Sequence, residues 1–327
     1  MKAVCFEKFG KAADVLQVVE IDKPEPGEGE VLVRLHASAP NPSDVKKRMG
    51  SFPNLVDEGY VIPHSDGAGV IEAVGAGVSQ ARIGDRVWIF NAQFGRRFGT
   101  AAEYVSVPSA HAPKLAEEAD FEIGACLGIP AMTAHRCVFA DGPVEGQTIL
   151  VTGGAGRVGY YAIQWAANAG GRVIATASNA DDEAACREAG AQIVINHRKE
   201  GWPDLLLEAT GGEKVTRVID VEFGANLEKV LDVIATGGVI ATYSSTQEPT
   251  PSLPFFRMMY LDLTIRMVIV YAMPRAAKEA AIADIDAALK AGKLKHRIAE
   301  TLPLDECARA HEIIEASKIR GSVVLTI

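Results

Sequence analysis

The hydrophobic and polar positions follow different patterns in the two parts of the chain. Over residues 1–110, short apolar or alternating runs are separated by Gly, Pro and Asn. Such spacing is typical of a small barrel-like β domain, and we expect strands at residues 31–37, 69–74 and 86–89. From about residue 123, strand-like runs alternate with helical runs. This alternation, with nearly continuous apolar strands, indicates a parallel sheet that is covered on both faces.

The second part contains six strand-like runs, the number in a complete doubly wound sheet. They occupy residues 148–151, 172–177, 192–195, 216–220, 238–243 and 263–271. The predicted helices between and after them occupy residues 158–169, 182–188, 202–208, 227–235 and 275–291. We expect residues 322–327 to form a strand that returns to the N-terminal domain. The sequence thus predicts a β-barrel domain (1–122 and 295–327) and a Rossmann domain of the α/β class (123–294).

A glycine-rich turn links the first strand of the predicted parallel sheet to its first helix. Glycines let the backbone approach a ligand closely, and the amide groups that open a helix favour an anion. The turn follows an apolar strand and precedes an amphipathic helix, which is the setting of a dinucleotide's pyrophosphate. The residues expected to bind it are Gly153, Gly154, Ala155, Gly156, Arg157, Val158 and Gly159.

Composition and charge narrow the class of protein. The chain has 327 residues, of which 48% are hydrophobic, and a net charge of −9. Such an acidic balance argues against binding to nucleic acid or to an anionic membrane surface. No run approaches the roughly 18 apolar residues of a membrane span, and the N-terminus becomes charged too early for a signal peptide. The five scattered cysteines suggest reduced thiols, so we expect a cytoplasmic protein.

Several short motifs stand in an order that resembles the zinc-independent quinone oxidoreductases, a zeta-crystallin-like branch of the medium-chain dehydrogenase/reductase superfamily. The resemblance implies a GroES-like β domain joined to a Rossmann domain, with the cofactor in the cleft between them, and a homodimer. The matching motifs lie at residues 41–44, 65–71, 84–87, 102–104, 128–134, 153–159, 190–191 and 310–312.

The residues at the zinc positions of related enzymes argue against a metal. The zinc-dependent relatives bind zinc through a Cys, a His and a second Cys or acidic residue. At the matching places this chain has residues 42–44, Ser65 and Ile129, and Ile129 cannot bind a metal. The cysteines of the structural zinc lobe are also missing. His64 lies one place from a ligand position, and we interpret it as structural. Without a Lewis acid, the expected hydride acceptor is a quinone or an activated alkene.

The end of the second Rossmann strand bears on the choice of nicotinamide cofactor. An NAD site normally has an acidic residue there, whereas Ser178 and Asn179 leave room for a 2′-phosphate. The resemblance also implies NADPH. The acidic run 181–183 either repels that phosphate or forms the solvated first turn of a helix. We favour NADPH and keep NADH open. Further cofactor-binding candidates are Thr133, His197, Tyr243 and Ser244, and other candidate positive charges are Arg198, Lys318 and Arg320.

Hydride transfer builds negative charge on an oxygen of the acceptor, which needs a hydrogen-bond donor or a cation. By resemblance, Asn41 and Asp44 line the nicotinamide end of the cleft, and Thr133 bonds the carboxamide. The other interpretations are a plain turn at Asn41 and a core hydroxyl at Thr133. Lys46 stands where quinone oxidoreductases commonly have Tyr, and it resembles the enone and alkenal reductases. Its basic neighbours, Lys47 and Arg48, also fit an ordinary solvated face.

Two apolar regions suggest a substrate pocket and a subunit contact. The candidates for a pocket wall, each of which also fits an ordinary core role, are Phe52, Leu55, Phe94, Met267 and Tyr271. The aromatic and Met-rich residues 251–260 either cover the cleft mouth or form a subunit contact. The apolar strand 263–271 is expected at the edge of the Rossmann sheet, where it invites pairing with a second copy of the chain.

The leading hypothesis is an NADPH-dependent, zinc-free reductase of quinones or activated alkenes such as α,β-unsaturated carbonyls. One alternative is a cofactor-binding protein with a structural or regulatory role and little turnover. Another is a zinc-type alcohol dehydrogenase, which the missing ligands argue against.

Overall fold

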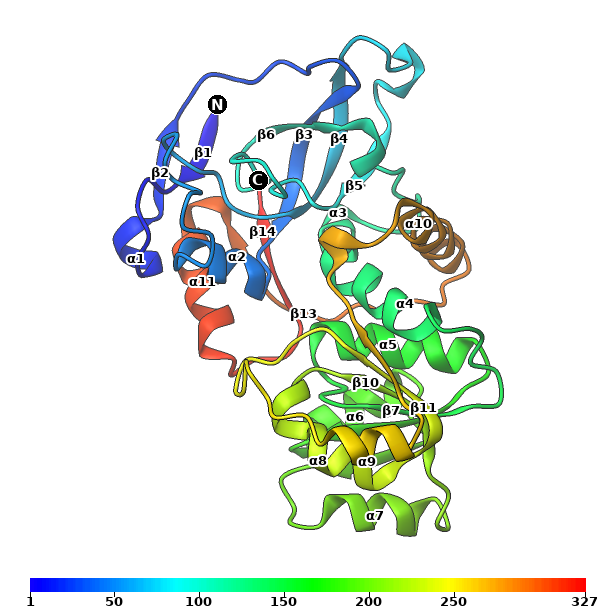
Figure 1. The fold of residues 1–327 in the computed structure, drawn as a ribbon. Helices are drawn as coiled ribbons and strands as arrows, with labels where there is room; N and C mark the ends of the chain where they lie inside the picture. Colours follow the sequence, from blue (N-terminus) through cyan, green and yellow to red (C-terminus); the bar gives the residue numbers. More distant parts are fainter. The chain divides into compact units, whose positions relative to one another are not determined.

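The computed structural model describes all 327 residues, which form two compact units. The first unit contains residues 1–129, 282–292 and 296–327, so both ends of the chain belong to it (Figure 1). The second unit contains residues 130–281 and 293–295. Residues 282–292, which the sequence assigned to the Rossmann domain, thus pack with the first unit.

The first unit is built around an antiparallel sheet in which β3 is central. Its neighbours in the sheet are β4 on one side and β14 on the other, and β6 also pairs with β3. A separate antiparallel pair joins β1 to β2. The strands are β1 (Lys2–Cys5), β2 (Gln17–Glu20), β3 (Glu30–Ala39), β4 (Asp66–Val74), β5 (Arg86–Ile89), β6 (Tyr104–Pro108), β13 (Ile298–Pro303) and β14 (Ser322–Thr326).

The C-terminal strand returns to the first unit, as the sequence predicts. Leu325 of β14 pairs with Ser38 of β3 in antiparallel register, and Figure 1 shows the red β14 beside the blue β3. The consecutive apolar residues Val323, Val324 and Leu325 of β14 are all buried, so both faces of this strand are covered. The helices of this unit are α1 (Ala12–Val15), α2 (Pro42–Arg48), α3 (Phe121–Gly124) and α11 (Cys307–Ala316).

The second unit is a doubly wound parallel sheet, which confirms the predicted fold class. The strands lie in the order β12-β11-β10-β7-β8-β9, and every neighbouring pair is parallel. The bounds are β7 (Thr148–Val151), β8 (Arg172–Ala177), β9 (Ile193–Asn196), β10 (Val215–Asp220), β11 (Ile234–Thr242) and β12 (Thr264–Met267). The central strand β7 is buried along its whole length, and β10 is buried except at Thr216, because helices cover both faces of such a sheet.

The helices of the second unit alternate with its strands. They are α4 (Met132–Phe139), α5 (Arg157–Asn168), α6 (Ala180–Glu188), α7 (Trp202–Ala209), α8 (Phe223–Val233) and α9 (Phe255–Tyr260), while α10 (Arg275–Lys290) continues into the first unit. Short 3-10 or π turns occur at η1 (Gln80–Arg82), η2 (Ser109–His111), η3 (Leu127–Ala131), η4 (Val270–Ala272) and η5 (Leu304–Glu306). No helix has both the length and the apolar character that crossing a bilayer requires.

The structure corrects the predicted strand 263–271. This strand does lie at the sheet edge, but β12 covers only Thr264–Met267. After β12, the Val268 amide still donates to the Thr242 carbonyl (2.7 Å), and the chain then turns into η4. Apolar character alone does not distinguish these buried residues from a longer strand, because both give the same sequence pattern.

A hydrogen-bonded pair of histidines lies buried between β3 and α11 in the first unit. His64 has a left-handed backbone (φ 80°), and its Nδ1 lies 2.8 Å from Ser38 Oγ. Its Nε2 lies 2.9 Å from Nε2 of His311, and Cys307 Sγ is 3.7 Å away. Burial lowers the pKa of His64 well below its usual value, and burial and then Arg48 lower the pKa of His311 to about 3. The side chain of His64 is thus held by hydrogen bonds on both ring nitrogens.

This buried pair predicts a loss of stability in mild acid. In the unfolded chain the imidazoles take up protons below about pH 6.5, whereas in the folded protein they stay neutral, so acid favours the unfolded state. The contribution is complete above pH 6.5, and at pH 5 His311 alone has lost about 2 kcal/mol of it. Urea unfolding at pH 7.5 and pH 5.0 measures the difference.

The matched variant is His64→Gly, because glycine suits the left-handed backbone and removes one imidazole. We expect its stability to depend less on pH than that of the wild type. An exposed imidazole provides the control, and His197→Asn should keep the wild-type dependence. Equal pH dependence in wild type and His64→Gly would contradict the assignment.

Candidate functional site

The glycine turn is held against the neighbouring strand by hydrogen bonds. The Gly153 amide donates to Thr176 Oγ1 (2.9 Å), and the Gly154 amide donates to the Thr176 carbonyl (3.0 Å). Gly153 has a left-handed backbone (φ 59°), which a residue with a side chain rarely adopts. The turn ends at Gly156, the N-cap of α5, where no side chain satisfies the helix amides. The positive end of the α5 dipole lies at this turn and favours an anion there.

Three of the glycines differ in what a side chain would meet. A Cβ at Gly154 would lie 2.8 Å from Cys186 Sγ, and one at Gly159 would lie 2.5 Å from the Gly153 carbonyl. Both positions therefore need glycine for the packing of the turn itself. A Cβ at Gly156 would meet only the Gly153 carbonyl, at 3.1 Å, and the backbone there (φ −72°) suits any residue. Gly156 is therefore the position where a side chain occupies the space before α5 at the lowest cost to the fold.

Two polar side chains next to the turn were missed by the sequence analysis. Asp220 ends β10 and is buried; its Oδ1 accepts from Thr152 Oγ1 (2.5 Å) and from Asn226 Nδ2 (2.7 Å). Thr152 Oγ1 in turn accepts from the Val221 amide (3.0 Å). Burial raises the pKa of Asp220, and its second oxygen has no partner. An acidic residue that closes an apolar strand beside a glycine turn was the available signal.

The acidic run at residues 181–183 forms the first turn of α6. Asn179 is its N-cap, because Asn179 Oδ1 accepts from the Asp182 amide (2.9 Å). The Asn179 side-chain amide also donates to Asp182 Oδ2 (2.8 Å), and Glu183 pairs with Arg187 (2.8 Å). Asp182 is buried against this cap instead of standing in solvent. The run is thus explained by the helix start, where acidic groups suit the helix dipole.

The other cofactor candidates of the second unit gather at the carboxyl ends of its strands. His197 is exposed after β9, and its amide donates to the Ala177 carbonyl (3.2 Å), beside Ser178. Thr133 is buried in α4. In an open parallel sheet, ligands bind outside the carboxyl ends of the strands, so this edge is the expected place for the cofactor. Lys318 and Arg320 belong to the first unit.

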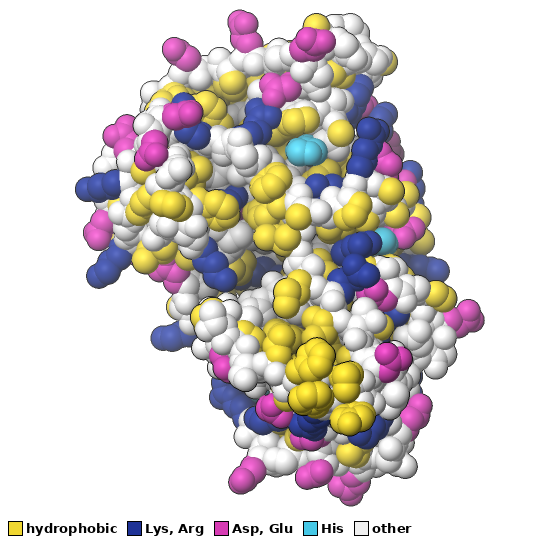
Figure 2. All heavy atoms as spheres, viewed as in Figure 1, with side chains coloured by type: hydrophobic (Ala, Val, Ile, Leu, Met, Phe, Trp, Pro, Cys, Tyr) yellow, Lys and Arg dark blue, Asp and Glu magenta, His cyan; other side chains and the backbone are white.

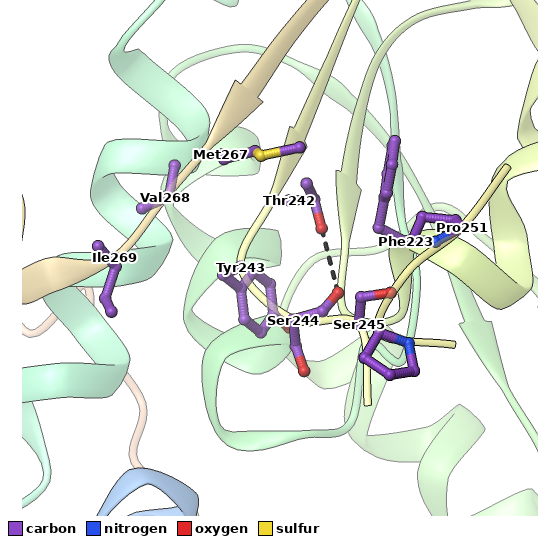
Figure 3. Close-up of a pocket in the computed structure, with 10 residues that line it drawn as sticks. Phe223, Thr242, Tyr243, Ser244, Ser245, Pro251, Met267, Val268 and Ile269 are labelled. Carbon is purple, nitrogen blue, oxygen red and sulfur yellow. Dashed lines mark hydrogen bonds between the residues drawn. The ribbon is translucent and has the colours of Figure 1, made fainter. Parts of the chain in front are cut away.

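A cavity of about 310 Å³ opens where β11 and β12 end. Figure 3 shows Tyr243 and Ser244 following β11 on one side, with Met267 and Ile269 on the other. Burial, followed by the charges of Cys137 and Asp220, raises the pKa of Tyr243 well above its usual value. The cavity is lined by Phe223, Thr242, Tyr243, Ser244, Ser245, Pro249, Pro251, Met267, Val268 and Ile269. Its lining combines apolar side chains with the hydroxyl residues Thr242, Tyr243, Ser244 and Ser245, which suits a ring that carries polar groups.

The predicted apolar pocket wall is distributed over both units. Met267 lines the cavity, while Tyr271 is buried after it. Phe52 and Phe94 are exposed on the first unit, and Leu55 packs against a core cluster there. Met267 is therefore the candidate that the structure places at a cavity.

The predicted catalytic residues lie at the start of α2 in the first unit. Asn41 is the N-cap, and its amide donates to Asp44 Oδ2 (2.8 Å). Asn41 Nδ2 donates to Asp66 Oδ2 (2.8 Å), which also accepts from the Ile129 amide (2.7 Å). Asn41, Asp44 and Asp66 are all buried, and burial raises the pKa of Asp66 well above its usual value. Asn41 thus begins a helix instead of a plain turn, and the side chains form a polar cluster.

The three basic residues that follow do not share one face. Lys46 is exposed, but Lys47 and Arg48 are buried, so the expectation of a solvated basic face is wrong for these two. Consecutive helical residues point in different directions, which separates Lys46 from Lys47. Lys47 Nζ lies 3.8 Å from Asp44 Oδ1 and donates to Ser65 Oγ (3.3 Å).

One group of side chains in the structure has the residue types of a metal site. The ligand-type atoms of His64, Cys307 and His311 lie within 4.8 Å of one another. Two imidazole nitrogens on a tetrahedral zinc are about 3.3 Å apart, but those of His64 and His311 are 2.9 Å apart, a hydrogen-bond distance. The Arg48 guanidinium is close enough to lower the pKa of His311, which disfavours a further cation. Hydrogen bonding explains this group.

Comparisons with known proteins agree with this arrangement. A family model described as a zinc-binding dehydrogenase matches residues 158–287, and one described as an alcohol dehydrogenase GroES-like domain matches residues 27–117. The chain is 32% identical to the quinone oxidoreductase of Homo sapiens over 332 residues, which covers 100% of this chain and 98% of the relative. It is 28% identical to a 2-haloacrylate reductase of Burkholderia sp over 335 residues (99% and 98%).

Solved structures give the same result. A mycobacterial protein complexed with NADPH superposes with a TM-score of 0.89 at 29% identity, over 100% of both chains. An NAD-dependent alcohol dehydrogenase superposes with a TM-score of 0.87 at 32% identity, also over 100% of both chains. With this full-length similarity and both matched domains, the chain belongs to the quinone oxidoreductase branch of the medium-chain dehydrogenase/reductase superfamily.

Proposed function

We propose that the chain is an NADPH-dependent reductase that transfers hydride to a quinone without zinc. The observation that carries the proposal is the glycine turn that Thr176 fixes at the start of α5, where the helix dipole favours an anion. The mycobacterial relative of the same fold is complexed with NADPH, and the human relative is a quinone oxidoreductase.

In this proposal the pyrophosphate lies against residues 153–159, because these supply backbone amides and the positive end of the α5 dipole. Ser178, Asn179 and His197 face the 2′-phosphate. The Asp182 carboxylate is turned toward the Asn179 amide, and its charge is also favoured by the N-terminus of α6. The nicotinamide half extends toward Tyr243 and Ser244. The NAD-dependent relative keeps NADH as the second candidate cofactor.

The proposed chemistry needs a donor for the oxygen that gains charge when hydride leaves C4 of the nicotinamide. Asn41, Asp44 and the exposed ammonium of Lys46 are the polar groups that α2 supplies. A quinone does not need zinc as a Lewis acid. Its ring becomes aromatic when it is reduced, and the negative charge is then held on a phenolate oxygen. Asp44 and Ser65, two of the places that match zinc ligands, are both within reach of Lys47 Nζ.

An activated alkene is the second candidate substrate. Lys46 resembles the lysine of enone and alkenal reductases, and one relative reduces a haloacrylate. A cationic donor is suited to the enolate oxygen that forms when hydride adds to such a double bond.

A panel of acceptors tests the proposal. After treatment with a chelator, the purified protein should oxidise NADPH with a benzoquinone or a naphthoquinone, and more slowly with an α,β-unsaturated ketone. NADH should be a poorer donor, and a primary alcohol with NADP⁺ should give no reaction. Absorbance at 340 nm measures each rate. Binding of NADPH without turnover of any acceptor would favour the non-catalytic alternative, and activity restored only by zinc would overturn the zinc-free mechanism.

Changing Gly156 to Val should abolish cofactor binding and preserve the fold. A branched side chain occupies the space where we place the pyrophosphate, while its Cβ meets only one carbonyl. We expect the Kd for NADPH, measured by titration calorimetry, to rise at least about a hundredfold, and the Tm to change little. Gly156→Ala should show a smaller effect of the same sign. Unchanged affinity of Gly156→Val for NADPH would contradict the placement of the pyrophosphate at this turn.

We further propose a homodimer that forms along the edge of the Rossmann sheet. β12 is the edge strand, and hydrophobic side chains gather on the face of this unit near α9 (Figure 2). The exposed apolar residues there are Leu253, Phe255, Phe256, Met259, Tyr260, Met267 and Ile269. An unpaired edge strand beside an apolar patch favours a two-fold contact between identical chains.

Light scattering of the purified protein should give a mass of twice 34.8 kDa. The double change Phe256→Glu with Tyr260→Glu places charge on side chains that are 69% and 79% exposed, so it should yield a folded monomer. Val18→Glu, on an exposed residue of the first unit, is the control and should leave the mass unchanged. A monomeric mass for the wild-type protein at micromolar concentration would contradict the proposed homodimer.

A further inference from the structure

We propose that Lys47 is a positioning residue of the reaction site, and that its buried ammonium group compensates the charge of Asp44 and Asp66, the two carboxylates that accept the backbone and side-chain amides of Asn41. The kinetic part of this inference rests on the proposed reductase function. The structural part depends only on the contacts inside the first unit.

The ammonium group of Lys47 is surrounded by oxygen atoms. It donates to the Gln93 carbonyl (3.2 Å), to Gln93 Oε1 (3.3 Å) and to Ser65 Oγ (3.3 Å). Asp44 Oδ1 lies 3.8 Å from the same nitrogen, and Lys47 is only 4% exposed. A buried ammonium costs several kcal/mol unless it is paired and hydrogen-bonded, so every one of these contacts contributes to holding it.

The carboxylates beside Lys47 are the reason for a cation at this place. Asp44 and Asp66 are both buried, and the charge of Asp44 contributes to the raised pKa of Asp66. Lys47 opposes that effect for Asp66, and both carboxylates favour the charged form of Lys47 against the burial that lowers its pKa. His64, which burial keeps neutral, is another titratable group that interacts with Lys47. Lys47 is therefore the positive charge that offsets the two carboxyl groups in this buried site.

Each of the two carboxylates accepts a hydrogen bond from a different amide group of Asn41. Asp44 Oδ2 accepts the Asn41 backbone amide (2.8 Å), and Asp66 Oδ2 accepts the side-chain amide (2.8 Å). Asp66 also accepts the Ile129 amide (2.7 Å), which joins this group to the segment before α4. Asn41 is thus oriented by the carboxylates of Asp44 and Asp66. These need a nearby positive charge, and Lys47 supplies that charge.

If Lys47 contributed only packing, the loss of stability on its substitution would depend on pH differently than if Lys47 acts through its charge. In Lys47→Met the side-chain length is kept and the charge is lost. The two carboxylates then repel each other, and the folded state carries that cost only while both are ionised. The loss of stability relative to wild type should therefore be large at pH 8 and smaller at pH 5, where a proton relieves the repulsion. Lost packing alone gives the same loss at every pH.

The first arm of the experiment measures Tm from pH 5 to pH 8. Lys47→Met should lose more at pH 8 than at pH 5, and Lys47→Arg should recover part of that loss because it restores the charge. The neighbour Lys46 is exposed, so Lys46→Met is the matched control and should follow wild type at each pH. If Lys47→Met does not fold, the double variant Lys47→Met with Asp44→Asn removes both partners and should fold. A pH-independent loss would overturn the proposal.

The second arm measures kinetics with NADPH and a quinone. Lys47→Met should lower kcat by about tenfold or more, since misplaced polar groups slow the chemical step. The Kd for NADPH should stay within about twofold, because the pyrophosphate site lies on the other unit. The acid limb of the kcat/KM profile should move to higher pH in Lys47→Met and return in Lys47→Arg.

The two arms separate the two proposals. An inactive wild type refutes the reductase function, while the pH dependence of Tm still decides whether Lys47 compensates the carboxylates. An active wild type together with an unshifted acid limb in Lys47→Met refutes the positioning role alone.

Discussion

The hydrogen bonds that fix the glycine turn between two strands are the constraint on which the second unit depends. On one side, Thr176 of β8 accepts and orients the amides of Gly153 and Gly154. On the other side, Asp220 of β10 holds Thr152, the residue before the turn. Because both anchors are buried polar groups, a turn that moved would leave them without partners in an apolar core. The direction of the α5 amides is therefore set by the sheet itself.

Much of this arrangement can be predicted from the sequence, because local residue patterns determine its strands and helices. The runs 148–151, 172–177 and 86–89 match β7, β8 and β5 residue for residue, since buried strands between turn residues leave a clear signal. The helix expected at 158–169 is α5, displaced by one residue, because the glycines before it and Gly170 after it mark its ends. The full doubly wound set was thus predictable from alternation alone.

The side-chain arrangement of the site could not be predicted in the same way. Lys46 and Lys47 are identical in composition and adjacent in sequence, yet one is exposed and the other is buried, because only the position of α2 on the sheet decides which way each points. Asp182 shows the same limit. Its charge suggested a conflict with a 2′-phosphate, but the Asn179 cap turns it inward. Long-range partners such as Asp66 and Asn41 have no local signature.

The place of β14 in the first sheet has a consequence for biosynthesis. This strand follows the whole second unit in the sequence, yet it lies between β13 and β3, near the middle of its sheet. A chain emerging from the ribosome therefore exposes one side of β3, which can pair with strands of other chains, until β14 has emerged. The residues of the second unit all precede position 296, so they are synthesised before β14. The sheet of the first unit is thus begun before the second unit and completed after it, and newly made chains depend on β14 for protection from aggregation.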